Sequence, residues 1–88
     1  MLSFGHRRKL TAKEVRDILV RFLAGTVKPH EFDTFVSVSI EDPRLDAIAV
    51  RCDGLRSEFP PEVPGHYCGE VGIEVMRQFI RELEKDAV

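Results

Sequence analysis

A helix that is specified at both ends is the feature that most constrains what this chain can fold into. Thr11 and Glu14 match the capping box, in which each side chain accepts a hydrogen bond from the other residue's backbone N–H. The apolar residues that follow recur at helical spacing and share one face: Val15, Ile18, Leu19, Phe22 and Leu23. Gly25 suits the end of the helix because glycine reaches the left-handed conformation with little steric cost. We therefore predict a helix over residues 12–24 that packs its apolar face into a core.

A short second helix is predicted to begin near Pro29, because proline is well suited to a first helical position. Phe32, Phe35 and Val36 have the spacing of one helical face. Across residues 35–40, β-branched residues alternate with serine, which is a strand pattern. No partner strand is predicted, so we interpret this segment as a helix that passes into an extended connection.

A third helix is predicted to begin at Asp42 and Pro43, an N-cap carboxylate followed by proline at the first helical position. Its core-facing residues are Leu45, Ile48, Ala49, Cys52 and Leu55. We predict that Gly54 marks its end.

Residues 58–65 contain three prolines and are predicted to form a loop, with Phe59 and Val63 holding it against the core. A fourth helix is predicted over residues 70–86. Its inner face comprises Ile73, Met76, Phe79, Ile80 and Leu83.

The predicted fold class is therefore all-α, a small four-helix bundle-like domain with a short second helix and a proline-rich loop before the last helix. A chain of 88 residues has room for one domain, which we place at residues 10–88. Residues 1–9 carry a basic run without periodicity and are expected to form a flexible tail. No apolar run approaches the ~20 residues that span a bilayer, and no apolar signal-peptide core follows the basic residues. We expect a cytoplasmic protein with no membrane partner.

Charge is distributed unevenly along the chain. Residues 1–28 carry seven Lys/Arg and two Asp/Glu, a net charge of +5, whereas residues 29–74 carry three Arg and ten Asp/Glu, a net charge of −7. The acidic middle suggests a non-catalytic protein-interaction domain that binds a basic partner protein. The candidate partner-binding residues are Glu31, Asp33, Glu41, Asp42, Asp46 and Asp53. The alternative interpretation is that these carboxylates are helix caps and solvated positions.

The sequence does not favour binding to nucleic acid. The short second helix, the candidate recognition helix of a helix-turn-helix, would present Glu31 and Asp33 and no arginine, which opposes phosphate binding.

An alternative function is a small zinc- or thiol-dependent protein that uses Cys52, His66 and Cys68, with His30 as a further ligand. The paired Cys-x-x-Cys spacing of zinc sites is absent, so the competing interpretation is two reduced thiols, an exposed His66 and a Tyr67 that anchors the loop. No catalytic residue and no cofactor are predicted. A homodimer is a third hypothesis, because a chain of this size buries only roughly 60–65% of its unfolded surface.

The segments Asp42-Pro43-Arg44-Leu45 and Gly65-His66-Tyr67-Cys68 look like those of short uncharacterised bacterial helical proteins. The four-helix layout with an acidic middle is similar to that of bacterial toxin-immunity proteins. This resemblance implies a domain whose acidic face docks a basic toxin. The acidic stretch leading to paired tyrosines that marks colicin-immunity proteins is not present, so no site residues are carried over.

Overall fold

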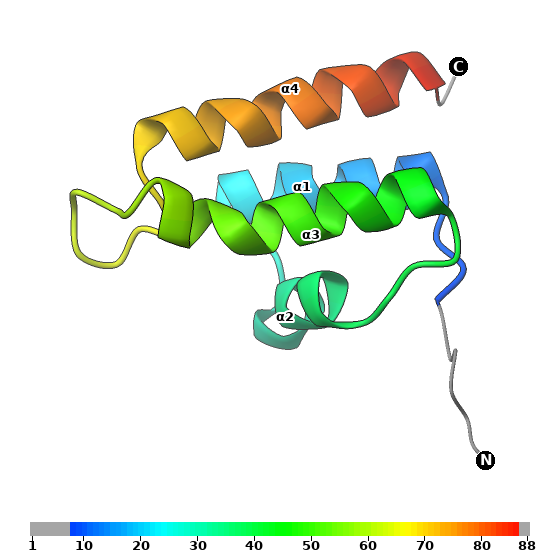
Figure 1. Ribbon diagram of the computed structural model, residues 1–88, viewed down its shortest axis with the longest axis horizontal. Coiled ribbons are helices and arrows are strands. Elements are labelled where there is room, and N and C mark those ends of the chain that lie inside the picture. Colours follow the sequence, from blue (N-terminus) through cyan, green and yellow to red (C-terminus); the bar gives the residue numbers. More distant parts are fainter. Residues whose placement is uncertain (1–7, 87–88) are drawn as a thin grey trace.

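The computed structural model describes residues 8–86, in which the chain forms four helices and no strand. They are α1 (Ala12–Ala24), α2 (Pro29–Ser37), α3 (Pro43–Glu58) and α4 (Glu70–Asp86). Helix α4 packs mainly against α1, and α2 packs mainly against α3. Figure 1 shows the three longer helices on one side of the molecule and the short α2 beneath α3. The predicted all-helical bundle is confirmed.

The local signals at the two ends of α1 operate as predicted. The Glu14 backbone N–H donates to Thr11 Oγ1 at 3.1 Å, and the Thr11 N–H donates to Glu14 Oε1 at 2.9 Å. Gly25 has a φ of 77°, and its N–H donates to the Phe22 carbonyl at 3.1 Å. Between these ends, Val15, Ile18 and Leu19 are buried.

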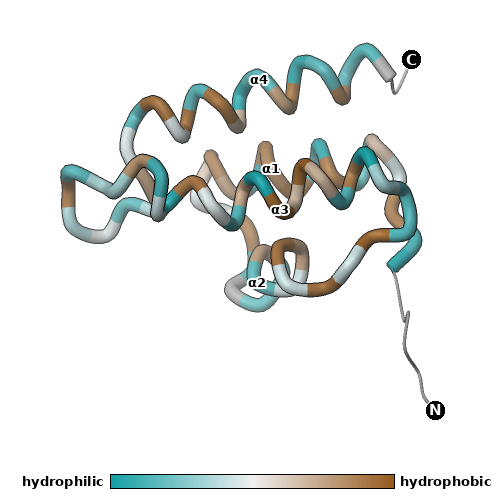
Figure 2. Tube along the Cα trace, viewed as in Figure 1, coloured by the Kyte–Doolittle hydropathy of each residue, from teal (hydrophilic) through white to brown (hydrophobic). Residues whose placement is uncertain are grey.

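The core is built from one face of each helix and from two residues outside the helices. Figure 2 shows hydrophobic positions recurring along α1 and α4 between hydrophilic ones. Ile40, in the connection before α3, and Cys68, in the loop before α4, are as deeply buried as the helical core residues. The most deeply buried larger side chains are Phe35, Leu19, Ile40, Leu55, Met76, Leu83 and Val15.

An aromatic cluster joins α1, α2 and the loop before α4. The rings of Phe22 and Phe32 stack with centroids 3.9 Å apart. Tyr67 meets both rings edge-on, at 5.2 Å and 5.3 Å, and Phe35 lies 5.9 Å from Phe32. Phe32 therefore lies at the centre of contacts that hold the short α2 in place.

Helix α3 begins as predicted but ends later. Asp42 Oδ1 accepts the Arg44 backbone N–H at 2.9 Å and caps the helix. The prediction that Gly54 ends the helix is wrong, because α3 continues to Glu58. Gly54 keeps a negative φ, and burial of Leu55 in the next position favours continuation of the helix.

The connection between α2 and α3 is extended, as predicted, but it has a partner that the sequence did not indicate. The Arg8 N–H donates to the Ser39 carbonyl at 2.9 Å, and the Glu41 N–H donates to the Arg8 carbonyl at 2.8 Å. The Asp46 carboxylate accepts the Ile40 N–H at 3.0 Å. Arg8 is therefore fixed by the domain, although residues 1–9 were expected to form a tail; residues 1–7 lie outside the described part of the chain.

The proline-rich loop between α3 and α4 is closed at its base. The Gly69 N–H donates to the Phe59 carbonyl at 2.7 Å, and Phe59 packs against the core as predicted. At the tip, the His66 N–H donates to the Val63 carbonyl at 3.2 Å across a turn in which Gly65 has a φ of 92°. The prediction that Val63 anchors the loop is wrong, because its side chain is 51% exposed beside this turn.

A glycine in α4 permits close packing of the loop on the helix. A Cβ at Gly72 would lie 2.6 Å from Cys68 Sγ and 3.3 Å from Cys68 Cβ. We expect Gly72→Ala to lower the free energy of unfolding, because overpacking a core by one methyl group costs about 1–3 kcal/mol and exceeds the gain in helix propensity. Urea denaturation measures the effect.

Gly54→Ala in α3 is the matched control, because a Cβ there meets nothing within 4 Å. It is expected to raise the free energy of unfolding by up to about 1 kcal/mol. Adding Cys68→Ala, which removes the crowded sulfur atom, is expected to recover part of the loss caused by Gly72→Ala. If Gly72→Ala and Gly54→Ala changed the free energy of unfolding equally, the close contact at Gly72 would not limit the size of its side chain.

Candidate functional site

The six predicted partner-binding carboxylates are spread over α2, the connection that follows it and α3. Their environments divide them into two groups. Glu31, Asp42 and Asp46 accept hydrogen bonds from groups of the domain. Asp33, Glu41 and Asp53 are exposed, as Asp42 also is, and Asp53 lies within ion-pair distance of Arg56.

Glu31 joins α2 to α1 through Arg21. The Arg21 guanidinium donates two hydrogen bonds to the carboxylate, one from Nη1 to Oε1 and one from Nη2 to Oε2 at 2.9 Å. This bidentate contact lowers the pKa of the Glu31 carboxyl group, because the hydrogen bonds and the positive charge favour its ionised form. Glu31 therefore positions the short helix, and its charge is balanced within the chain.

Asp42 and Asp46 stabilise the backbone around the start of α3 through hydrogen bonds. Asp42 caps the helix, and Asp46 accepts the N–H of Ile40, so that one turn of α3 holds the extended connection. Asp53 lies further along α3, with its carboxylate 3.6 Å from the Arg56 guanidinium.

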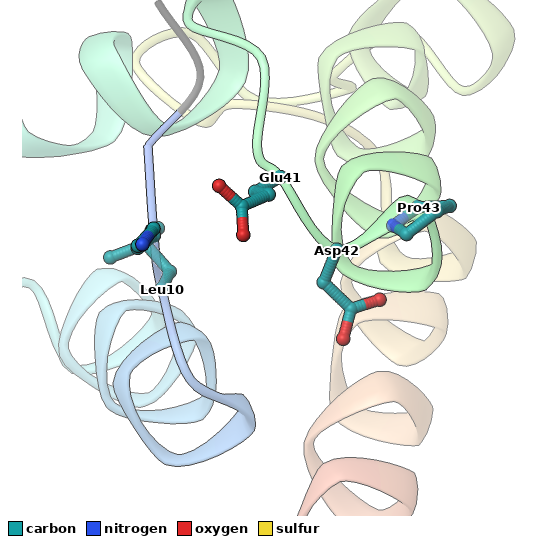
Figure 3. Close-up of a pocket in the computed structure, with 5 residues that line it drawn as sticks. Leu10, Glu41, Asp42 and Pro43 are labelled. Atoms are coloured by element: carbon teal, nitrogen blue, oxygen red, sulfur yellow. The ribbon is translucent and has the colours of Figure 1, made fainter.

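Glu41 and Asp42 lie on a shallow depression of about 470 Å³, which is also lined by Lys9, Leu10 and Pro43. In Figure 3 the Glu41 carboxylate lies between Leu10 and Asp42, where the N-terminal segment approaches the start of α3. Pairing of Arg8 with residues 39–41 brings these two parts of the chain together. No local pattern in the sequence predicts that pairing, so the position of Lys9 and Leu10 beside the carboxylates could not be predicted either.

Two adjacent exposed carboxylates in an open depression can accept hydrogen bonds from an ammonium or guanidinium group. The depression is open to solvent.

The cysteines and His66 occupy different environments. Both Cys52 and Cys68 are free thiols in the core, with 0% and 2% of their surface exposed. Burial raises the pKa of the Cys52 thiol to about 12, with the nearby Cys68 as a smaller cause, and burial also raises the pKa of Cys68. His66, by contrast, is exposed in the loop. Within residues 8–86, no three His, Cys, Asp or Glu side chains gather in a metal-binding arrangement.

Tyr67 anchors the loop, as one interpretation of the sequence predicted. Its hydroxyl group donates to the Cys52 carbonyl at 2.9 Å, and the Arg56 guanidinium lies 5.9 Å from its ring centroid. Burial raises the pKa of the phenol to about 12. The sequence segment around His66, Tyr67 and Cys68 therefore has a structural role in the fold.

Comparison with protein-family models, with curated proteins and with solved structures gives no match to this chain. In the part of the chain that the structure describes, no helix has both the length and the apolar character needed to cross a bilayer.

Proposed function

We propose that this chain is a non-catalytic protein-interaction domain that binds a basic protein through carboxylates around the start of α3. The observation that supports this proposal is the position of Glu41 and Asp42, which are adjacent and exposed at the depression beside Leu10. The net charge of −7 over residues 29–74 would attract a basic partner and favour the correct orientation during encounter.

This mode of binding is the one implied by the layout that resembles toxin-immunity proteins, in which the acidic face docks a basic toxin. On the present geometry, Glu41 and Asp42 would contact the partner directly, with Asp33 and Asp53 adding to the attraction. Glu31 and Asp46 would stabilise the domain and would not touch the partner, because each is half-buried and already binds a group of its own domain.

Affinity capture from the native host tests the proposal, with the wild type compared with a Glu41→Gln/Asp42→Asn variant. Asparagine keeps the N-cap hydrogen bond, so this variant removes charge without removing the cap. We expect the wild type to retain a stoichiometric basic protein that is released at high salt, and the variant to bind it at least tenfold more weakly.

A Glu82→Gln/Glu84→Gln variant is the matched control, because it removes the same charge from exposed positions on α4, outside residues 29–74. It should bind as the wild type does. Recovery of no stoichiometric partner, or of a partner whose binding does not respond to salt, would contradict the proposal.

A further inference from the structure

The two cysteines of the chain belong to the same core. Cys52 lies on the inner face of α3 and Cys68 lies in the loop before α4, and both are buried free thiols. The contacts described above use the Cys52 carbonyl but neither sulfur atom for a hydrogen bond. A buried thiol packs as a small apolar side chain, so packing alone does not require sulfur at both positions.

Two contacts bring the loop segment around Cys68 against the face of α3 that carries Cys52. The Tyr67 hydroxyl group donates to the Cys52 carbonyl at 2.9 Å. A Cβ at Gly72 would lie 2.6 Å from Cys68 Sγ and 3.6 Å from Leu55 Cβ, so the Cys68 sulfur lies where α4 meets Leu55. Leu55 follows Cys52 by three residues, and both face the core. The Cys68 sulfur therefore lies beside the part of α3 that holds Cys52.

The two thiols also interact electrostatically, in agreement with this placement. Burial is the main reason that the pKa of Cys52 is raised to about 12, and the negative charge of an ionised Cys68 is the second cause. The pKa of Cys68 is raised by burial. Because the electrostatic effect runs from Cys68 to Cys52, Cys68 is the thiol that ionises first.

We propose that Cys52 and Cys68 are a redox pair that a small-molecule disulfide, such as oxidised glutathione, converts into a disulfide bridge between α3 and the loop. Cys68 reacts first, because a loop opens more readily than a packed helix. Its thiolate attacks one sulfur of the glutathione disulfide, forms a mixed disulfide and releases one glutathione. The Cys52 sulfur then attacks the Cys68 sulfur and releases the second glutathione. The two thiol protons pass to the two glutathione thiolates, so the chain is oxidised by two electrons and the glutathione disulfide is reduced by two.

The bridge fastens the proline-rich loop, which joins the end of α3 to the start of α4 (Figure 1), to the body of the domain. In the reduced chain, the hydrogen bond from the Gly69 N–H to the Phe59 carbonyl closes the base of this loop. A covalent link between the loop and α3 removes conformations from the open and the unfolded states. The reduced and oxidised chains therefore differ in how readily the loop opens. This inference goes beyond the proposed function and does not depend on it, because it involves no carboxylate.

Equilibration of the wild type in buffers of reduced and oxidised glutathione, followed by alkylation and mass spectrometry, tests the pair. The bridged chain has lost two hydrogen atoms and takes up no alkylating reagent. We expect the equilibrium constant for bridge formation to be at least tenfold larger in the folded chain than in the chain unfolded in urea, because the fold holds the two sulfur atoms near each other. A smaller ratio, or a folded chain that ends as glutathione adducts or covalent dimers, overturns the proposal.

Hydrogen exchange tests the effect on the loop. In the bridged chain the Gly69 N–H should exchange at least tenfold more slowly than in the reduced chain, and dithiothreitol should restore the original rate. The Thr11 N–H, which bonds to Glu14 at the start of α1, is the control and should keep its rate. Unchanged exchange at Gly69 in a bridged chain overturns the proposed fastening of the loop.

Single-cysteine variants test the order of attack. Cys52→Ala, which keeps the loop thiol, should form the glutathione adduct at least tenfold faster than Cys68→Ala, which keeps the thiol in α3. Circular dichroism and urea denaturation check that both variants remain folded to a similar extent. Faster reaction of Cys68→Ala overturns the assignment of Cys68 as the first thiol to react.

Discussion

Phe32→Ala is expected to lower the free energy of unfolding by about 3–5 kcal/mol, which is the usual range for removing a buried phenylalanine ring. Phe32 is 5% exposed and contacts three other aromatic rings, those of Phe22, Phe35 and Tyr67. The short α2 spans nine residues and has no side-chain hydrogen bond at its N-cap. Packing must therefore supply most of its stability.

Urea denaturation followed by circular dichroism measures the loss, and tyrosine fluorescence reports on the cluster itself. The chain has one tyrosine and no tryptophan, so the fluorescence comes from Tyr67. Val71→Ala is the control, because it truncates a 59% exposed side chain and should change stability by less than about 0.5 kcal/mol. A Phe32→Ala variant within 1 kcal/mol of the wild type would show that the aromatic cluster does not hold α2.

The parts of the fold that could be predicted from the sequence are those determined by local interactions. The bounds of α1 agree with the prediction because Thr11, Glu14 and Gly25 act on backbone groups within a few residues of themselves. The start of α3 agrees for the same reason, since Asp42 bonds to a backbone N–H two residues away.

The end of α3 shows where a local signal fails. Glycine permits a left-handed conformation but does not require one, and Gly54 stays helical. Contacts of Leu55 with the core decide the outcome, and these depend on residues far away in the sequence. The exposure of Val63 also could not be predicted from local sequence. It depends on the hydrogen bond between Gly69 and Phe59, which closes the loop.

The candidate site depends on contacts between distant parts of the chain even more strongly. The sequence located an acidic segment but could not separate carboxylates that hold the fold from those that remain exposed. Glu31 meets Arg21 across two helices, and Asp46 meets the backbone of Ile40 across a turn. The depression at Glu41 exists because Arg8 pairs with the connection before α3, which no periodicity predicts.

Raising the pH above about 9 is expected to destabilise the domain progressively, mainly through Cys52 and Tyr67, which the fold keeps neutral. The pKa of Cys52 is raised from 9.0 to about 12 and that of Tyr67 from 10.0 to about 12, in both cases mainly by burial. At pH values well below 9, both groups are protonated in the folded and the unfolded chain, so their contribution to stability is complete. At higher pH the unfolded chain loses these protons first, and stability falls until the folded groups ionise near pH 12.

Urea denaturation at a series of pH values between neutrality and about pH 11 measures this dependence. For Cys52 alone, the change in pKa from 9.0 to about 12 corresponds to an upper limit of about 4 kcal/mol. Cys52→Ala should be less stable than the wild type at neutral pH, because it leaves a small cavity, yet its stability should fall less steeply as the pH rises. Tyr67→Phe should also make the free energy of unfolding fall less steeply with pH. It should lower that free energy at every pH, because the hydrogen bond to the Cys52 carbonyl is lost. A wild-type profile that stays level up to about pH 11, or two variant profiles as steep as that of the wild type, would show that neither group is held neutral by burial.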